Sequence, residues 1–156
     1  MSYYDKVGTY YDKDAVDFEQ RYHENPALQR IRQSFRQHTK SYEQTTVLEV
    51  GFGPGFDLVH FAEQFPDRKF YGIDISAEMV RLTQEKIDRM GLKNAWVTKG
   101  SVEDIKVLFP EVQFDMIYVF FGALNTVNDL EGAFTDMRVV LSSGGRMVLT
   151  FVNKYY

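Results

Sequence analysis

Short apolar runs and longer amphipathic segments alternate along the chain from Thr46 onward. The short runs are rich in β-branched and aromatic residues and are bounded by turn-forming residues, a pattern typical of strands. The run at residues 114–120 is apolar nearly throughout, as expected for a strand that is covered on both faces. Five strands are predicted, over residues 46–50, 69–74, 95–98, 114–120 and 146–152.

The segments between these runs have apolar residues at helical spacing. After the first strand, Leu58 and Ala62 share one helical face, and Pro66 closes the segment. Ser76 is a suitable N-cap for the next helix, and Gly91 is a suitable end for it. Helices are therefore predicted over residues 56–65, 77–90 and 102–108, and from about 129 to 141, the last ending near Gly144 and Gly145.

Residues 1–42 form a polar, aromatic-rich segment in front of the first strand. Within this segment Leu28, Ile31 and Phe35 lie at helical spacing and predict a helix around Ala27–Phe35. The chain contains no internal repeat, low-complexity tract or Gly/Ser linker. We therefore interpret it as an N-terminal helical segment, residues 1–42, followed by one ligand-binding domain, residues 43–156.

Strands that alternate with helices imply right-handed crossovers and a parallel sheet with helices on both faces. The predicted fold is α/β: a three-layer, Rossmann-like, doubly wound sheet that is mostly parallel. In such sheets ligands bind beyond the carboxyl ends of the strands, near the switch in strand order. The chemistry of this chain is therefore expected in the loops that begin at Gly51, Asp74, Gly100 and Phe120.

Three alternating glycines, Gly51, Gly53 and Gly55, follow the first strand directly. Glycines at a strand-to-helix turn permit positive φ and let a ligand approach the backbone. Phe56 stands where a dinucleotide fingerprint has its third glycine, and the Gly-Lys-Ser/Thr ending of a phosphate loop is absent. Glu49 places a carboxylate beside the loop, which repels pyrophosphate and suits a ligand with an ammonium and a sulfonium group. The loop therefore disfavours NAD.

Asp74 ends the second predicted strand, about 20 residues after the loop, where an acid accepts hydrogen bonds from both hydroxyls of an unphosphorylated ribose. The alternative is that Asp74 caps the helix that begins near Ser76, since aspartate is a common N-cap. The preceding glycine loop favours the ribose interpretation.

Four ordered motifs resemble those of class I, Rossmann-like S-adenosylmethionine-dependent methyltransferases. They are Glu49–Gly55, Gly72–Ser76, Gly100–Asp104 and Phe114–Ile117, and the match extends from about Tyr42 to Val152. The resemblance implies that S-adenosylmethionine is the cofactor, that S-adenosylhomocysteine is the product, and that the tyrosine-rich N-terminal segment covers the cofactor as a lid. The resemblance also implies the cofactor-binding residues. Glu49 lies at the methionine amino group, Asp74 at the ribose hydroxyls, and the loop residues Gly51, Phe52, Gly53 and Gly55 beneath the methionine and ribose. The adenine is surrounded by Ile75, Met79, Ser101 and Val102, and further contacts come from Phe120 of the fourth strand and Tyr11 of the lid.

The chain departs from this family at two points. Ser101 stands where the family often has an aspartate that bonds the adenine amino group, and a serine accepts only a weaker, uncharged hydrogen bond. The family also continues past the fifth strand with a hairpin of two more strands, whereas this chain ends at Tyr156. We therefore expect a truncated chain whose sheet lacks the last two strands, with an uncovered edge through which copies of the chain associate.

The segment Phe120–Thr126 follows the fourth strand, where the family lines its methyl-acceptor pocket. It lacks the Asn/Asp-Pro-Pro-Tyr/Phe signature of enzymes that methylate exocyclic amines of DNA bases. It resembles small-molecule methyltransferases of this class instead, so we expect a small-molecule acceptor. We assign no metal ligand and no catalytic residue, because His23 and His60 are interpreted as exposed helix residues.

Composition narrows the remaining choices. The net charge of −4 argues against a nucleic-acid partner, which usually needs a basic face. No apolar run approaches the roughly 20 residues needed to span a bilayer, no signal-peptide pattern opens the chain, and cysteine is absent, so a cytoplasmic protein without a membrane partner is expected. One basic cluster is interpreted as the solvated side of a helix, with a contact to an anionic substrate as the alternative; it consists of Arg30, Arg32, Arg36, His38 and Lys40.

Two other functions remain open at this point. A nicotinamide-dependent oxidoreductase shares the predicted sheet, but the missing third glycine of the fingerprint disfavours it. A non-catalytic binding or scaffold protein with the same fold would have no affinity for the cofactor despite an intact glycine loop. Titration with NADH and with S-adenosylhomocysteine separates these alternatives from a methyltransferase.

Overall fold

A five-stranded sheet organises the chain. The computed structural model describes residues 1–153; residues 154–156, the end of the predicted ligand-binding domain, lie outside the described part. The strands are β1 (Thr46–Val50), β2 (Lys69–Asp74), β3 (Ala95–Lys99), β4 (Phe114–Val119) and β5 (Leu141–Leu149). The helices are α1 (Tyr3–His23), α2 (Pro26–Lys40), α3 (Phe56–Gln64), α4 (Ala77–Met90), α5 (Ile105–Leu108) and α6 (Leu130–Val140), with 3-10 turns η1 (Val102–Asp104) and η2 (Ala123–Thr126).

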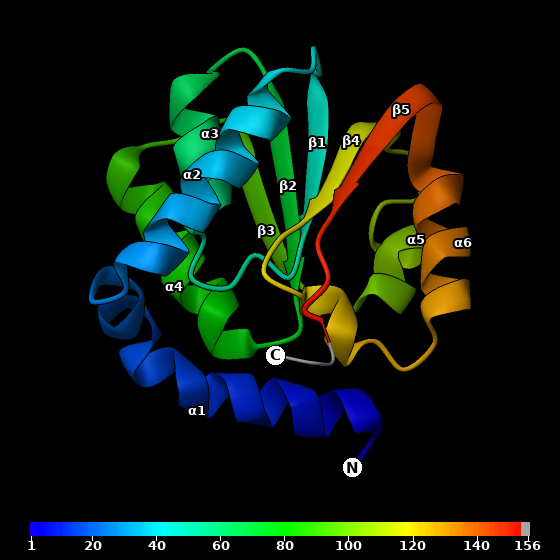
Figure 1. Cartoon of the computed structure of the whole chain (residues 1–156). Coiled ribbons are helices and arrows are strands. Elements are labelled where there is room, and N and C mark those ends of the chain that lie inside the picture. The colour runs from blue at the N-terminus through cyan, green and yellow to red at the C-terminus, as the bar shows by residue number, and fades with distance from the viewer. Residues whose placement is uncertain (154–156) are drawn as a thin grey trace.

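All neighbouring strands are parallel, in the order β3-β2-β1-β4-β5. The chain runs outward from β1 to β3, returns across the sheet to β4 and continues outward to β5. The switch in direction therefore lies between β1 and β4, which is where such sheets bind ligands. Figure 1 shows α2, α3 and α4 on one face, α5 and α6 on the other, and α1 across the carboxyl ends of the strands. The predicted three-layer, doubly wound α/β fold is confirmed.

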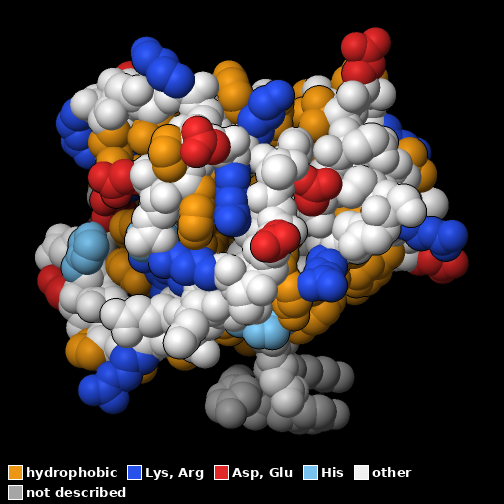
Figure 2. All heavy atoms as spheres, turned by 90° about the horizontal axis from the view of Figure 1, so that it is seen from above, with side chains coloured by type: hydrophobic (Ala, Val, Ile, Leu, Met, Phe, Trp, Pro, Cys, Tyr) orange, Lys and Arg blue, Asp and Glu red, His pale blue; other side chains and the backbone are white. Residues whose placement is uncertain are grey.

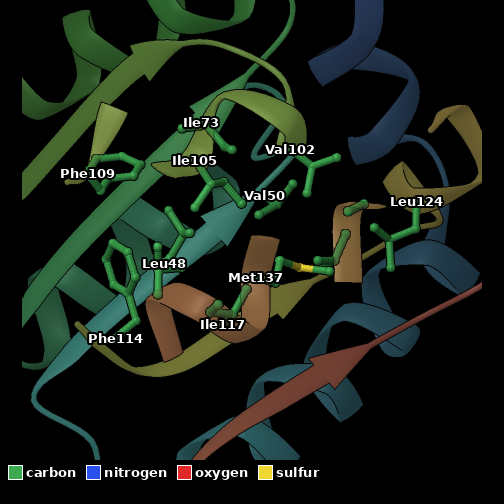
Figure 3. Packing of buried hydrophobic residues seen from close by; sticks show 13 residues of the cluster. Leu48, Val50, Ile73, Val102, Ile105, Phe109, Phe114, Ile117, Leu124 and Met137 are labelled. Atoms are coloured by element: carbon green, nitrogen blue, oxygen red, sulfur yellow. The ribbon is translucent and has the colours of Figure 1, made fainter. Parts of the chain in front are cut away.

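The core consists of two apolar layers, one on each side of the sheet. Figure 3 shows the layer between the sheet and helices α5 and α6, where Leu48, Ile117 and Met137 are buried. Met116 and Tyr118 of β4 belong to the layer on the opposite face. β4 is thus buried on both faces, which explains why its sequence is apolar nearly throughout.

The fifth strand is displaced from its predicted position. It covers Leu141–Leu149 and follows α6 directly, whereas the sequence predicts residues 146–152. Its register with β4 shifts between Leu141 and Arg146. Gly144, at φ +79°, lies in this irregular stretch, so the glycines interrupt the strand instead of preceding it. The predicted boundary is wrong because a β-bulge and a helix end favour the same residue type.

The N-terminal segment forms α1 and α2. α1 begins with a capping box, in which the side chains of Ser2 and Asp5 accept from each other's backbone N–H groups. Asn25 caps α2 with its side-chain oxygen, and α2 contains the predicted helix around Ala27–Phe35. The division of the chain after residue 42 stays a prediction. In the described part, no helix is long and apolar enough to cross a membrane.

Candidate cofactor-binding site

The glycine loop leaves β1 at the carboxyl edge of the sheet. Gly51, Gly53 and Gly55 have φ values of +70°, +57° and +79°. A Cβ atom at Gly51 would collide with Ala123, and one at Gly55 would collide with Thr83, whereas one at Gly53 would meet open space. Close packing and positive φ therefore require glycine at the first and third positions. Gly53 leaves a bare stretch of backbone beside a free volume, which fits a ligand that lies against the main chain.

Asp74 lies beside this loop at the end of β2 and is 7% exposed. Its carboxylate accepts hydrogen bonds from the Gly53 N–H at 2.8 Å and the Ser76 N–H at 2.9 Å. Burial raises the pKa of Asp74 to about 6, although both backbone N–H groups lower it. Ser76 is the N-cap of α4, since its hydroxyl accepts from the Met79 N–H. The alternative that Asp74 caps this helix is therefore wrong, and Asp74 holds the glycine loop against β2.

A cavity of about 220 Å³ opens at the carboxyl ends of the strands, between the glycine loop and α1. Nine of the predicted site residues line it, and they come from α1, from the end of β2 and the segments that follow four strands, and from the first turn of α4. They are Tyr11, Gly51, Gly53, Asp74, Ile75, Met79, Ser101, Val102 and Phe120. The structure thus brings most of the predicted cluster together around one free volume. The contacts of these residues with a cofactor stay a prediction.

Helix α1 covers this cavity and is bound to its rim at two points. Asp12 accepts a hydrogen bond from the Ser76 hydroxyl at 2.6 Å, at the start of α4. Nearer the N-terminus, the Tyr4 hydroxyl donates to the Glu103 carboxylate at 2.7 Å and accepts from the Asn128 N–H at 3.2 Å. The two attachments lie on opposite sides of the cavity, so α1 has the position of a lid.

The family model described as "Methyltransferase domain" matches residues 41–155, most of the chain. The chain belongs to the methyltransferase domain family. Solved structures that share its fold include one in complex with S-adenosylhomocysteine, which agrees with the cofactor that the sequence resemblance implied.

Known relatives of this methyltransferase act on different kinds of acceptor. The tRNA (guanine-N(7)-)-methyltransferase of Edwardsiella ictaluri is 35% identical over 80 residues, 51% of this chain and 34% of that protein. The malonyl-[acyl-carrier protein] O-methyltransferase 1 of Ilyobacter polytropus is 31% identical over 117 residues, 74% of this chain and 41% of that protein. The solved complex of DhpI with S-adenosylhomocysteine shares the fold, with a TM-score of 0.72 at 20% identity over 90% of this chain and 65% of that chain. The methyltransferase therefore spans well under half the length of both curated relatives.

Three predicted site residues of the methyltransferase lie behind the cavity lining. Phe52 is buried, and its ring lies where a Cβ atom at Gly72 would stand. Gly55 precedes α3 and packs against the side chain of Thr83. The third residue is Glu49. Phe52 and Gly55 support the loop on its packed side, and neither forms part of the free surface of the cavity.

Glu49 is buried in the interior and does not line the cavity. Its carboxyl accepts a hydrogen bond from the Tyr118 hydroxyl at 2.8 Å. Burial raises the pKa of Glu49 to about 8, although the charges of Arg32 and Arg36 lower it. The carboxyl is therefore mostly protonated at neutral pH, and the argument that its negative charge repels pyrophosphate loses its physical basis. The exclusion of NAD rests on the family instead.

The basic cluster of α2 is divided between the surface and the interior. Arg32 is 8% exposed and Arg36 is mostly buried, and both bind the carboxylate of Asp57 in the first turn of α3. The interpretation as a solvated helix face is therefore wrong for these two residues, because α2 packs on α3 at this point. It holds for the exposed side chains of Arg30, His38 and Lys40.

The aromatic ring of Phe121 lies between Arg32 and the cavity. Its guanidinium carbon is 4.7 Å from the ring centre of Tyr22, 4.9 Å from that of Phe56 and 4.4 Å from that of Phe121, which lines the cavity. The Arg32 Nε atom is buried without a hydrogen-bond partner among the described residues. Phe121 has φ +53°, a strained conformation for a bulky residue, and this strain occurs at the cavity wall.

His60 is half-buried, so its interpretation as an exposed residue is wrong. It lies on α3, and burial together with the charges of Arg36 and Lys40 lowers its pKa to about 4. His23 is exposed, as predicted. Neither histidine lines the cavity, so neither is placed to take a proton from an acceptor there.

Two aromatic residues of the lid were not predicted. Tyr4 and Phe18 line the cavity together with the predicted Tyr11. The three residues are spaced by seven positions, which is close to two helical turns and places them on one face of α1. This spacing is the signal in the sequence from which the inner face of the lid can be found.

Proposed function

We propose that this methyltransferase transfers the methyl group of S-adenosylmethionine to a small-molecule acceptor. The observation that carries the proposal is the covered cavity, which lies under α1 and has an apolar wall at Phe120, Phe121 and Val127. A mostly apolar cavity beneath a covering helix suits a small ligand.

The proposal also assigns parts of the cofactor to parts of the cavity. The bare backbone at Gly53 lies beneath the methionine and ribose, Asp74 accepts from the ribose hydroxyls, and Ile75 and Met79 pack on the adenine. Bound S-adenosylmethionine supplies a methyl group on a positively charged sulfur. The residues of the chain orient the acceptor in line with the bond that breaks, and such positioning supplies much of the rate.

The second candidate is an RNA acceptor, which is favoured by the similarity to the tRNA methyltransferase of Edwardsiella ictaluri. The charge of this chain favours the small molecule. The net charge is −4. On the face at the amino ends of the strands, opposite the cavity, Figure 2 shows acidic and basic side chains interspersed instead of one basic surface. Proteins that bind RNA usually offer the phosphates a basic face.

Calorimetric titration with S-adenosylhomocysteine tests the cofactor site. We expect micromolar binding by the wild-type chain and a loss of about 1–3 kcal/mol of binding free energy in Asp74→Ala, because the ribose hydroxyls lose their partner. Asp67→Ala removes an exposed acid and serves as the matched control. Equal binding by Asp74→Ala and wild type would remove Asp74 from the site.

Formation of S-adenosylhomocysteine from S-adenosylmethionine tests the acceptor. The wild-type chain is incubated with pools of small molecules bearing hydroxyl, amine, thiol or carboxylate groups, and separately with unmodified tRNA. Turnover that depends on a small-molecule pool supports the proposal. Turnover with tRNA alone contradicts it and favours the second candidate.

A further inference from the structure

A hydrogen-bonded pair, Ser101 and Asp104, lies where β3 ends at the cavity. The Gly100 N–H donates to the Asp74 carbonyl oxygen at 2.9 Å, so the start of this pair is fixed beside the end of β2. The Ser101 hydroxyl donates to the Asp104 carboxylate at 2.8 Å, and the Ser101 N–H donates to the same oxygen at 2.7 Å. Ser101 lines the cavity, whereas Asp104 is exposed outside it.

These two hydrogen bonds determine what Ser101 offers to a ligand. A carboxylate has no proton to donate, so the hydroxyl proton of Ser101 is directed to Asp104. The hydroxyl oxygen also accepts from the Asp104 N–H in the capping box of η1, which leaves one lone pair for the cavity. The neighbouring Val102 also lines the cavity and is the first residue of η1. Its N–H therefore has no acceptor within its own helix. Ser101 thus offers an acceptor at this end of the cavity.

We propose that Asp104 is a positioning residue that makes Ser101 an acceptor-only partner for the amino group of the cofactor's base. The proposal rests on the cofactor site proposed above. A 6-aminopurine offers an N–H donor to Ser101. A 6-oxopurine offers an acceptor at the same position and leaves the Ser101 oxygen unpaired.

The pair also gives a physical account of the serine at position 101. The family often has an aspartate there, whose charge strengthens the hydrogen bond from the amino group. In this chain the carboxylate stands three residues later and acts through the serine hydroxyl, which it polarises and orients. Selectivity for the amino group is thereby retained without a charge in the cavity at this position.

Calorimetry with two ligands tests the proposal. S-adenosylhomocysteine and S-inosylhomocysteine differ only at position 6 of the purine and its ring nitrogen, and each is titrated into wild type, Ser101→Ala, Asp104→Ala and Glu111→Gln. We expect wild type to prefer the adenosyl ligand by about 10–100-fold. Asp104→Ala frees the hydroxyl to donate to the 6-oxo group, so the preference falls by about tenfold. Glu111→Gln removes another exposed carboxylate and keeps the wild-type preference.

The ratio of the two affinities separates positioning from a general loss of structure. A loosened η1 weakens both ligands alike and leaves the ratio unchanged, whereas a reoriented hydroxyl changes the ratio. The exchanged variant Ser101→Asp/Asp104→Ser returns a carboxylate to the cavity and is expected to restore the preference. An unchanged affinity ratio in Asp104→Ala overturns the proposed role of Asp104 and does not contradict the proposed cofactor site. Failure of the wild-type chain to bind S-adenosylhomocysteine overturns both proposals.

Discussion

Three buried acids near the glycine loop differ in their partners and therefore in their charge. Asp57 binds the guanidinium groups of two α2 arginines. Asp74 accepts from two backbone N–H groups, and burial raises its pKa to about 6. Glu49 has a tyrosine hydroxyl as its partner, and burial raises its pKa to about 8. Loss of the Asp57 carboxylate would leave charged partners uncompensated, because the two guanidinium groups have little access to water.

Replacement of Asp57 by Asn is expected to lower the free energy of unfolding by about 3–5 kcal/mol. The change leaves two guanidinium groups without their counter-charge, and that of Arg32 is buried. Urea denaturation followed by circular dichroism measures the loss. Asp67→Asn, at an exposed acid, is the control and should stay within about 0.5 kcal/mol of wild type. Equal stability of the two variants would show that Asp57 does not hold α2 on α3.

Replacement of Glu49 by Gln is expected to flatten the dependence of stability on pH. Burial raises the pKa of Glu49 from the ordinary 4.5 to about 8, so the folded chain holds an extra proton between these values. The free energy of unfolding therefore falls as pH rises through this window, by at most about 1.4 kcal/mol per pH unit. Glutamine has no such proton to lose. Urea titrations should therefore show that the free energy of unfolding of the variant increases relative to that of wild type as pH rises. Parallel profiles would show that Glu49 ionises freely in the fold.

At the scale of secondary-structure elements, the sequence predicts the strands whose limits are set by neighbouring residues in the chain. The four strands β1 to β4 lie within one residue of their predicted limits, because each is a short run rich in β-branched and aromatic residues and bounded by turn residues. β5 was misplaced because its glycines lie in an edge strand, where the missing outer partner permits an irregular backbone. The pattern in the sequence does not reveal which strand is at the edge.

The candidate site likewise contains residues that a local motif predicts and contacts that no local motif predicts. The loop from Gly51 to Gly55 and the acid at Asp74 were predicted because a short motif fixes their positions relative to strand ends. The bond from Arg32 to Asp57 spans 25 positions, and the bond from Tyr4 to Glu103 spans 99. Such pairs depend on how helices pack on the finished sheet, and no local pattern encodes them.

Removal of the hydroxyl oxygen of Tyr4 tests the attachment of α1 at this residue. Tyr4→Phe removes the hydrogen bond to Glu103 and the acceptor of the Asn128 N–H, while the ring that lines the cavity stays in place. We expect S-adenosylhomocysteine to dissociate about 3–10-fold faster, because opening the lid then breaks fewer hydrogen bonds. Displacement followed by stopped-flow fluorescence measures the rate. Tyr3→Phe, at the more exposed neighbouring ring, is the control. Unchanged dissociation in Tyr4→Phe would show that the lid is held elsewhere.

At the scale of the molecule, the sheet of the described residues has an open edge of low charge. In the part of the chain that the structure describes, β5 pairs with β4 alone, and its nine residues contain one charged side chain, Arg146. Phe151 and Val152, just beyond it, are more than half exposed. Soluble proteins usually protect such an edge with lysine, proline or a covering segment, because its unpaired N–H and C=O groups bind other strands.

The whole chain is therefore expected to associate through β5 as its concentration rises. Strand pairing satisfies the free backbone groups and covers the exposed side chains of Phe151 and Val152. Phe151→Lys places a charge beside the edge and should weaken association by about tenfold, or about 1.4 kcal/mol. Val16→Lys makes the same change on the outer side of α1, where Val16 is 88% exposed, and should leave association unchanged. Sedimentation velocity from low to high micromolar concentration measures the constants. A monomer throughout that range would mean that the bulge around Gly144 already protects this edge.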